Sequence, residues 1–482
     1  MSKRISLFLF VMLLALTLLT AKDAATGITP RSGNTEENPT TSPSPSPTVT
    51  NPIDLGQGQL EDSVGGLLEG TATSDGSFSI SYAPDFSFNK LSFQLALRIQ
   101  GRATNDPFDL TFDFSEWTLS PRENDQSTTD YVMEALMQYS SFIRYIQWGD
   151  RYEPIYIRYG KLAGITLGDG ALLNGYFDQA VGTHVTRPGL NFTLDGALIH
   201  VPNAGFEYVT NDLFNPTLLA WRIYARPFGL QYPTSFFANT ELGVSYAENP
   251  SASFAARDSE NPHTRKLIAI DMGIPLLSYD HFNLAFFADL LVQSPGSYSP
   301  RPALATRYGF FGHSQSFFLF NTSLTIPAFG TYYTDYFDSG FEKLTLSDRE
   351  KSILQTGSMR VDAMAGLNFT RLGAYVRARI RSDYSEGNFY NYKFQANARI
   401  DKRLFNIVSL DLSYEKLYPT SIGEGASEGF FEGLYTLRNV EIAASTIIKI
   451  KPYSFTIGLS MVFDDQAQSA LLVDTAVRIS IL

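Results

Sequence analysis

The chain has 482 residues, of which 44% are hydrophobic, 14% aromatic and 18% charged, which excludes a disordered chain with few aromatic residues. It contains no cysteine, which excludes disulfides, thiol chemistry and a lipid anchor on cysteine. Its net charge of −12, without a basic run, argues against nucleic acid as a partner, because phosphate binding requires a basic surface.

The first 21 residues have the pattern of a secretory signal peptide. Lys3 and Arg4 precede an apolar run over 5–19, and Ala21 offers a small residue at the cleavage site. The run is shorter than the roughly 20 residues that a membrane-spanning helix needs. We expect cleavage after Ala21, with an uncleaved N-terminal anchor as the alternative.

The next segment, 22–58, is rich in proline, serine and threonine and has no apolar periodicity. Proline cannot donate to a β-ladder, so we expect an extended periplasmic spacer here. A tether that reaches a cell-wall or periplasmic partner is the alternative.

From 59 to 482 the dominant pattern is an alternation of apolar and polar residues. It is clearest in the segments 91–100, 108–114, 373–383, 392–400, 408–415, 439–450 and 473–482. In the last of these, "VDTAVRISIL", Val477 and Ile479 share one phase and Arg478 takes the other. A period of two residues is that of a β-strand with one apolar face.

Such strands could build a soluble sandwich or a membrane barrel. Several segments approach the ~9–11 residues that cross a bilayer as a tilted strand, whereas strands in soluble proteins are mostly ~5–6 residues long. The terminal strand also fits a barrel, which must pair its last strand with its first because open edges in lipid leave backbone groups unpaired. We predict an all-β fold, an antiparallel transmembrane β-barrel over 59–482, with roughly 14–18 strands at about 25 residues each.

Two segments interrupt the alternation. Apolar residues recur at helical spacing over 129–149, with Asp130 as N-cap, which predicts a helical insertion that either plugs the lumen or packs on the rim. A shorter helix is expected at 347–355. The glycine-rich segment 159–179 lacks the features of a phosphate loop or a calcium loop, and we expect a surface loop there, with a loop that narrows the pore as the alternative.

With this signal sequence, the alternating strands of 91–482 and the terminal "VRISIL", the chain resembles bacterial outer-membrane β-barrel proteins of the porin-like class. The resemblance implies a location in the outer membrane, contact with its lipid and recognition of the last strand by the barrel-assembly machinery. That strand commonly ends in Phe or Trp in this class, whereas this chain ends in Ile481 and Leu482.

The sequence offers little for catalysis. None of the five histidines forms a pair with metal-ligand spacing, and no nucleophile elbow is present. The best candidate is His313 beside Ser314 and Ser316, but neither serine has the two-residue offset that would place both side chains on one face of a strand. We therefore expect no enzyme, no metal and no cofactor.

Charged residues in the polar phase of the strands are the candidates for lining a pore. They are Arg98, Asp109, Asp113, Arg158, Arg222, Arg226, Arg377, Arg379, Arg381, Lys393, Arg399, Asp411, Glu415 and Glu441. The row Arg377, Arg379 and Arg381 lies on one side of its strand and must face water or protein, because each cation in lipid costs ~2–4 kcal/mol. We expect glutamate at all three positions to spare folding and to change ion selectivity.

These observations predict a porin-like channel for small hydrophilic solutes. The alternatives are a barrel for uptake of hydrophobic compounds, with the helix as hatch, and a surface structural or adhesion barrel with a closed lumen. Homo-oligomerisation is left open.

Overall fold

The computed structural model divides the chain into two units, Met1–Ser46 and Pro47–Leu482. The described residues all belong to the second unit and run from 63 to 480. The gaps between them are 74–76, 106–107, 115–116, 119–126, 141, 152, 163, 177–187, 215, 230–235, 251–265, 280–281, 295–300, 315–317, 334–336, 339–352, 370–372, 401–407, 417–435, 438–439, 451–452, 464–466 and 468. The predicted signal peptide and spacer lie outside the described residues.

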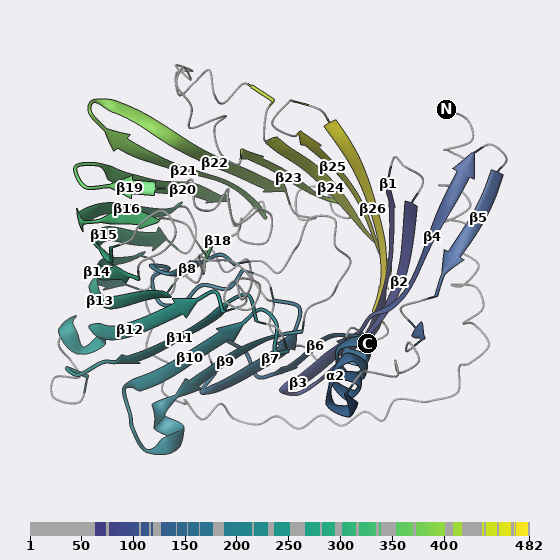
Figure 1. Ribbon diagram of the computed structural model, residues 1–482, viewed down its shortest axis with the longest axis horizontal. Helices are drawn as coiled ribbons and strands as arrows, with labels where there is room; N and C mark the ends of the chain where they lie inside the picture. The colour runs from purple at the N-terminus through teal and green to yellow at the C-terminus, as the bar shows by residue number, and fades with distance from the viewer. Residues whose placement is uncertain are drawn as a thin grey trace. The chain divides into compact units, whose positions relative to one another are not determined.

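Antiparallel strands build a closed wall (Figure 1). The wall strands are β1 (Ser63–Thr73), β2 (Ser77–Phe88), β3 (Leu91–Leu95), β4 (Leu97–Asn105), β6 (Ile143–Trp148), β7 (Ile155–Gly160), β9 (Gly189–Asp195), β10 (Ala204–Thr210), β11 (Leu219–Ala225), β12 (Glu241–Glu248), β13 (Lys266–Tyr279), β14 (Phe282–Gln293), β15 (Ala303–Ser314), β16 (Phe318–Phe329), β20 (Met359–Phe369), β21 (Ala374–Ser385), β22 (Asn388–Ile400), β23 (Val408–Lys416), β24 (Val440–Ile450), β25 (Tyr453–Phe463) and β26 (Ser469–Ser480). Short 3₁₀ turns, η2 (Gly196–Ile199) and η3 (Phe236–Asn239), follow β9 and precede β12.

The ring closes between its first and last strands. β1 pairs antiparallel with β26 over a register that runs from Gly65 opposite Ser480 to Thr73 opposite Leu472. We call the end of the barrel where β1 begins and β26 ends the terminal rim, and the other end the opposite rim. The predicted antiparallel transmembrane barrel is confirmed, and the terminal strand closes it by pairing with β1.

The described sheet has 22 strands, but β5 (Phe108–Asp113) lies outside the ring and β4 continues β3, which leaves 20 in the wall. An antiparallel pair of first and last strands requires an even number. The expected range of 14–18 was too low, because some connections are very short. Only Asn89 and Lys90 separate β2 from β3, and only Glu386 and Gly387 separate β21 from β22.

The two faces of the wall reverse the distribution seen in soluble proteins. Ile223 on β11 and Ile270 on β13 are 54% and 52% exposed, whereas their chain neighbours Arg222 and Asp271 are 2% and 5% exposed. Charged residues are almost never fully buried in ordinary folds unless they are paired. Apolar residues outside and polar residues inside are what a lipid-facing barrel requires, so the sandwich alternative is wrong.

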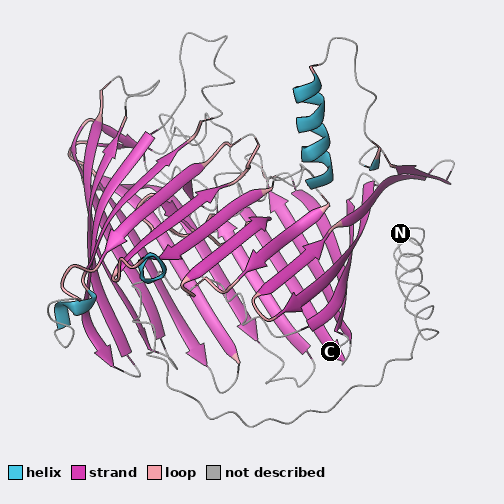
Figure 2. Cartoon of the chain, turned by 90° about the horizontal axis from the view of Figure 1, so that it is seen from below, coloured by secondary structure: helices cyan, strands magenta, loops and turns pink. Residues whose placement is uncertain are grey.

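The predicted helix is shorter than expected. α2 spans Thr128–Ser140, and the second half of the predicted segment forms β6, which pairs with β3 through Ile146 opposite Phe93. Apolar residues in this half fit both periods, and the ladder with β3 selected the strand. Figure 2 shows α2 beyond the ends of the strands rather than inside the ring. Of the second predicted helix, 353–355 forms the short strand β19, and the rest lies outside the described residues.

None of the helices in the described part of the chain combines the length and hydrophobicity needed to cross a membrane.

Candidate functional site: a loop folded into the barrel

The connection between β7 and β9 folds into the ring instead of lying on its surface. Its described residues, 161–162 and 164–176, are here called the inner loop. Ile165 and Tyr176 close it with two backbone hydrogen bonds, Ile165 N to Tyr176 O at 3.0 Å and the reverse at 2.9 Å. Figure 1 shows its short strand β8 (Leu173–Asn174) inside the ring. The expectation of a surface loop is therefore wrong, because this glycine-rich segment carries apolar side chains that need a dry partner.

A second connection, between β16 and β20, meets the inner loop. It contains β17 (Thr331–Tyr333), which pairs with β19 (Ile353–Gln355), and β18 (Phe337–Asp338), which pairs in parallel with β8. Both connections leave the wall at the opposite rim. Their pairing across a long stretch of chain ties the two insertions into one body.

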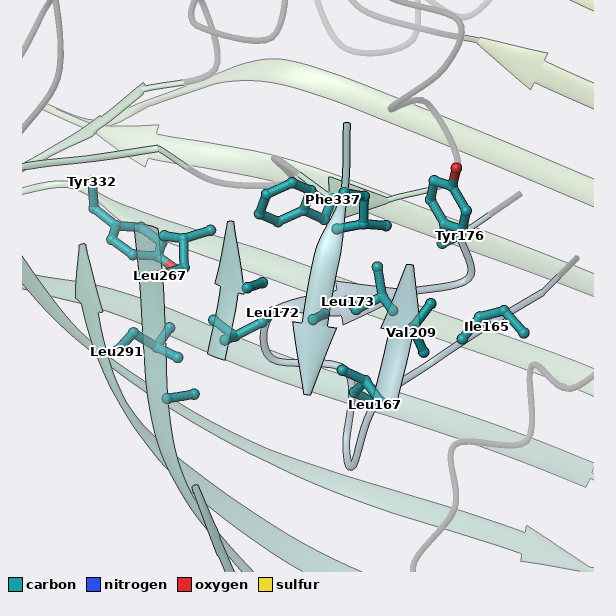
Figure 3. Packing of buried hydrophobic residues seen from close by; sticks show 14 of the residues in the cluster. Ile165, Leu167, Leu172, Leu173, Tyr176, Val209, Leu267, Leu291, Tyr332 and Phe337 are labelled. Carbon is teal, nitrogen blue, oxygen red and sulfur yellow. The ribbon is translucent and has the colours of Figure 1, made fainter. Parts of the chain in front are cut away.

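An apolar cluster holds this body against one side of the wall. Leu162, Leu173 and Tyr176 of the inner loop are fully buried. Phe337 of β18 belongs to the same cluster and lies beside Leu173 and Tyr176 (Figure 3). The wall contributes small inward-facing residues at this place, namely Ala220, Ala247, Ala269, Ala303 and Ala305. Small side chains leave room for the loop, so the barrel interior is filled here as a protein core is.

An ion pair between loop and wall completes the attachment. Arg307 on β15 places Nη1 3.1 Å from Asp169 Oδ1 of the inner loop and 2.8 Å from Asp289 Oδ2 on β14, and its Nη2 donates to the Asp169 carbonyl at 3.2 Å. The arginine side chain is 8% exposed and the Asp289 side chain is 0% exposed. Because Asp169 belongs to a loop inside the ring, this contact shows that Arg307, and with it every second residue of β15, faces the interior of the barrel.

A second arginine lies at the centre of three carboxylates. Arg222 on β11 makes a two-point ion pair with Asp271, and its Nη1 lies 2.7 Å from Glu241 Oε1 and 3.4 Å from Glu207 Oε1. The inner loop passes directly over it, because a Cβ placed on Gly168 would be 2.6 Å from Arg222 Nε. Only glycine allows the backbone this close to the guanidinium.

The predicted arginine row on β21 is only partly available to solvent. Arg379 and Arg381 both pair with Asp362 on β20, at 2.6 Å and 3.0 Å, and the Arg381 side chain is 5% exposed. Arg377 lies over the ring of Tyr375 at 4.6 Å. Two of the three arginines therefore hold neighbouring strands together, so the expectation that all three can be replaced without cost is corrected.

The wall beyond β21 has a wetter inner face. Arg399 on β22 and Asp411 on β23 lie 3.4 Å apart with side chains 37% and 31% exposed, and Asn397 on the same face is exposed. Glu415 accepts a hydrogen bond from Gln395 at 2.6 Å, and Glu441 accepts one from Ser460 at 3.5 Å. Charged groups are thus packed dry on β10–β16, whereas Arg399, Asp411, Glu415 and Glu441 on β22–β24 are partly exposed.

The remaining candidates for lining the pore are spread over several strands. Arg158 on β7 donates to Gln147 at 2.7 Å on the inner face, Arg226 pairs with Glu241 at 3.0 Å after β11, and Lys393 is 5% exposed. Arg98 lies on β4 opposite Ser81. Asp109 and Asp113 are on β5, outside the ring, so they do not line the barrel and their assignment is corrected. Alternation alone could not show that β5 leaves the wall.

Several charged residues inside the barrel were not among those predicted from the sequence. They are Asp169, Glu207, Glu241, Asp271, Asp289, Arg307, Arg360, Asp362 and Asp383. Most stand alone in an apolar run, as Asp289 does in "LAFFADLLV". A single charge in the inner phase of a strand is the signal that could have identified those on strands, whereas Asp169 lies in a loop and gives no such signal.

His313 lies on β15 with its ring stacked on Phe311 at 5.7 Å. Ser314 follows it in the opposite phase, and Ser316 lies outside the described residues. Among the residues the structure describes, no group of three or more His, Asp or Glu side chains could hold a metal ion. The absence of an enzymatic activity stays a prediction.

Comparison with protein-family models and with curated proteins gives no match. Among solved structures the chain is similar to OccAB1 of Acinetobacter baumannii, with 9% identity, 89% of this chain and 99% of that chain covered, and a TM-score of 0.33. OccK5 (OpdH) of Pseudomonas aeruginosa is 8% identical, with 88% of this chain and 100% of that chain covered and a TM-score of 0.35. The third structure is Wzi of Escherichia coli, an outer-membrane protein involved in group 1 capsule assembly and a carbohydrate-binding β-barrel. It is 11% identical, with 86% of this chain and 84% of that chain covered and a TM-score of 0.34. These TM-scores are below 0.5, so the likenesses carry no argument, and the barrel stands on the strand register of this chain.

Proposed function

We propose that the protein is an outer-membrane channel through which small hydrophilic solutes diffuse along one side of the barrel interior. The observation that carries the proposal is the unequal exposure of the charged inner face. Arg222, Asp271 and Asp289 are packed dry under the inner loop, whereas Arg399 and Asp411 reach water.

The dry side cannot serve as a path. Loop residues such as Leu173 and Tyr176 occupy it, and its charges form ion pairs whose side chains are only 0–14% exposed. A buried charge that loses its partner is costly, so this packing resists opening. Transport is therefore expected along β22–β24, where charges of both signs are hydrated.

The polar lining favours hydrophilic solutes over the hydrophobic alternative. Among the described residues, the apolar side chains of the inner loop pack against one another and against the wall in a buried cluster, which leaves little of their surface for a hydrophobic guest. An exposed pair such as Arg399 and Asp411 contributes little to stability, about 0–1 kcal/mol, so its role in the wall is more readily electrostatic than structural.

Current recording in planar lipid bilayers tests the proposal. The purified barrel is expected to give stepwise, ohmic current increments in KCl. A folded barrel, identified by gel mobility that changes on heating, that inserts but gives no current would favour the structural or adhesion barrel with a closed lumen. Retention of detergent or fatty acid through purification would favour the hydrophobic alternative.

A further inference from the structure

The wall divides at Ala96. On the side of Ala96 toward the terminal rim, β3 pairs with β6. The hydrogen bond from Ala96 N to Phe142 O, at 2.7 Å, is the last one between these two stretches of chain. On the side of Ala96 toward the opposite rim, β4 pairs with β2 along one edge and with β5 along the other. β4 and β5 thus form a two-stranded ribbon, here called the rim ribbon, that leaves the ring at the opposite rim (Figures 1 and 2).

The two faces of the rim ribbon differ in polarity. Phe112 and Phe114 share one face, are 50% and 54% exposed, and stack with ring centroids 6.4 Å apart. The opposite face carries exposed polar side chains, Arg102, Thr111 and Asp113. The ribbon is therefore amphipathic although only one of its strands belongs to the wall.

The apolar face continues the lipid-facing surface of the barrel. Phe78 on β2 is in the outer phase with Ile80 and Tyr82, and its ring meets that of Phe112 edge to face at 5.8 Å. Gly101 between them makes this contact possible, because a Cβ there would strike the Phe78 ring and lie 2.6 Å from the Thr111 carbonyl oxygen. The contact of these two rings therefore joins the outer surface of the wall directly to Phe112.

The direction of the bend decides what this face meets. A sheet that flares outward from a barrel turns its outer face toward the membrane and its inner face toward water. Figure 2 shows the projecting strands bending sideways at the rim. Trp117, 39% exposed, donates its Nε1–H to the Arg98 carbonyl at 2.5 Å, so the indole nitrogen is satisfied beside the ribbon, as suits an aromatic ring at a membrane interface.

We propose that the apolar face of the rim ribbon rests on the membrane leaflet at the opposite rim, with Phe112 and Phe114 in contact with lipid. The ribbon extends the lipid contact sideways beyond the barrel wall and leaves Arg102, Thr111 and Asp113 in water. Its binding surface is a lipid surface at the boundary between headgroups and acyl chains.

The absence of cysteine makes a direct test clean, because one introduced thiol is the only labelling site. Phe112→Cys and the matched control Thr111→Cys lie next to each other on opposite faces of β5. Each is labelled with an environment-sensitive fluorophore and reconstituted into phosphatidylcholine vesicles. Ile270→Cys on the lipid-facing side of β13 serves as the reference for full lipid contact. Quenching by brominated acyl chains and by aqueous iodide is then measured.

The label at Phe112→Cys is expected to be quenched several-fold more by brominated lipid than the label at Thr111→Cys, with the reverse order for iodide. Equal iodide quenching at the two positions would overturn the proposal. Shielding from iodide without quenching by brominated lipid, lost when the protein is diluted in lipid, would instead show a second copy on this face and also overturn it. If Phe112→Cys fails to insert, Phe114→Cys on the same face carries the same expectation.

Discussion

Asp169 and Arg307 are separated by 138 positions in the chain, and their side chains meet at 3.1 Å inside the barrel. The contact joins the inner loop to β15 and lies beside the pair of Arg307 with Asp289 at 2.8 Å. One arginine therefore serves both the wall and the insertion that fills part of the lumen.

Replacing Asp169 by asparagine should loosen the loop without unfolding the wall. Arg307 keeps Asp289 as a partner, and the lost charge-assisted hydrogen bond contributes about 1–3 kcal/mol. Single-channel recording should show a larger conductance or more open-channel noise for Asp169→Asn. Glu386→Gln, in the exposed hairpin between β21 and β22, is the control and should behave as wild type. Identical traces for all three proteins would show that the pair does not hold the loop.

Alanine at Gly168 should disturb the site more than alanine at Gly175. Both glycines have positive φ, +54° and +66°, so both substitutions strain the backbone. A Cβ at Gly168 also collides with Arg222, whereas a Cβ at Gly175 has nothing within 4 Å. The collision should cost a further ~1–3 kcal/mol, measured as a lower temperature for the heat-induced change in gel mobility. Equal shifts for the two variants would mean that the loop does not lie against Arg222.

Glutamate at Arg399 and at Arg381 should have different consequences. The Arg399 side chain is 37% exposed, so Arg399→Glu should fold and move the reversal potential in a KCl gradient toward cation selectivity, most strongly at low salt. The Arg381 side chain is 5% exposed beside Asp362, so Arg381→Glu places two buried carboxylates together, costs about 3–5 kcal/mol and should impair insertion. If the Arg399→Glu channel folds well and its reversal potential is unchanged, the inner face of β22 and β23 does not line the conduction path.

Deletion of 473–482 should prevent assembly. The segment pairs with both β1 and β25, and each backbone group left unpaired in lipid costs several kcal/mol. Deletion of 481–482 alone, beyond the end of β26, is the control and should leave the closing register intact. Normal membrane levels and heat-modifiable mobility of the longer deletion would contradict the observed closure.

The sequence by itself determined the class of the fold. A period of two residues and the choice between lipid and water on each face are local properties, and they can be read from neighbours such as Arg222 and Ile223 without knowing the fold. The antiparallel barrel and the closing place of the last strand follow from them, because lipid leaves a sheet no stable open edge.

Only the tertiary structure decided where the interior is dry. Whether a glycine-rich connection lies on the surface or in the lumen depends on residues far away in the chain, such as Arg307 for Asp169 and the inward alanines for Tyr176. The same long-range pairing ended α2 at Ser140, placed β5 outside the ring and separated packed arginines such as Arg381 from hydrated ones such as Arg399. Alternation assigns a face to each residue, but burial on that face is set by what else folds against it.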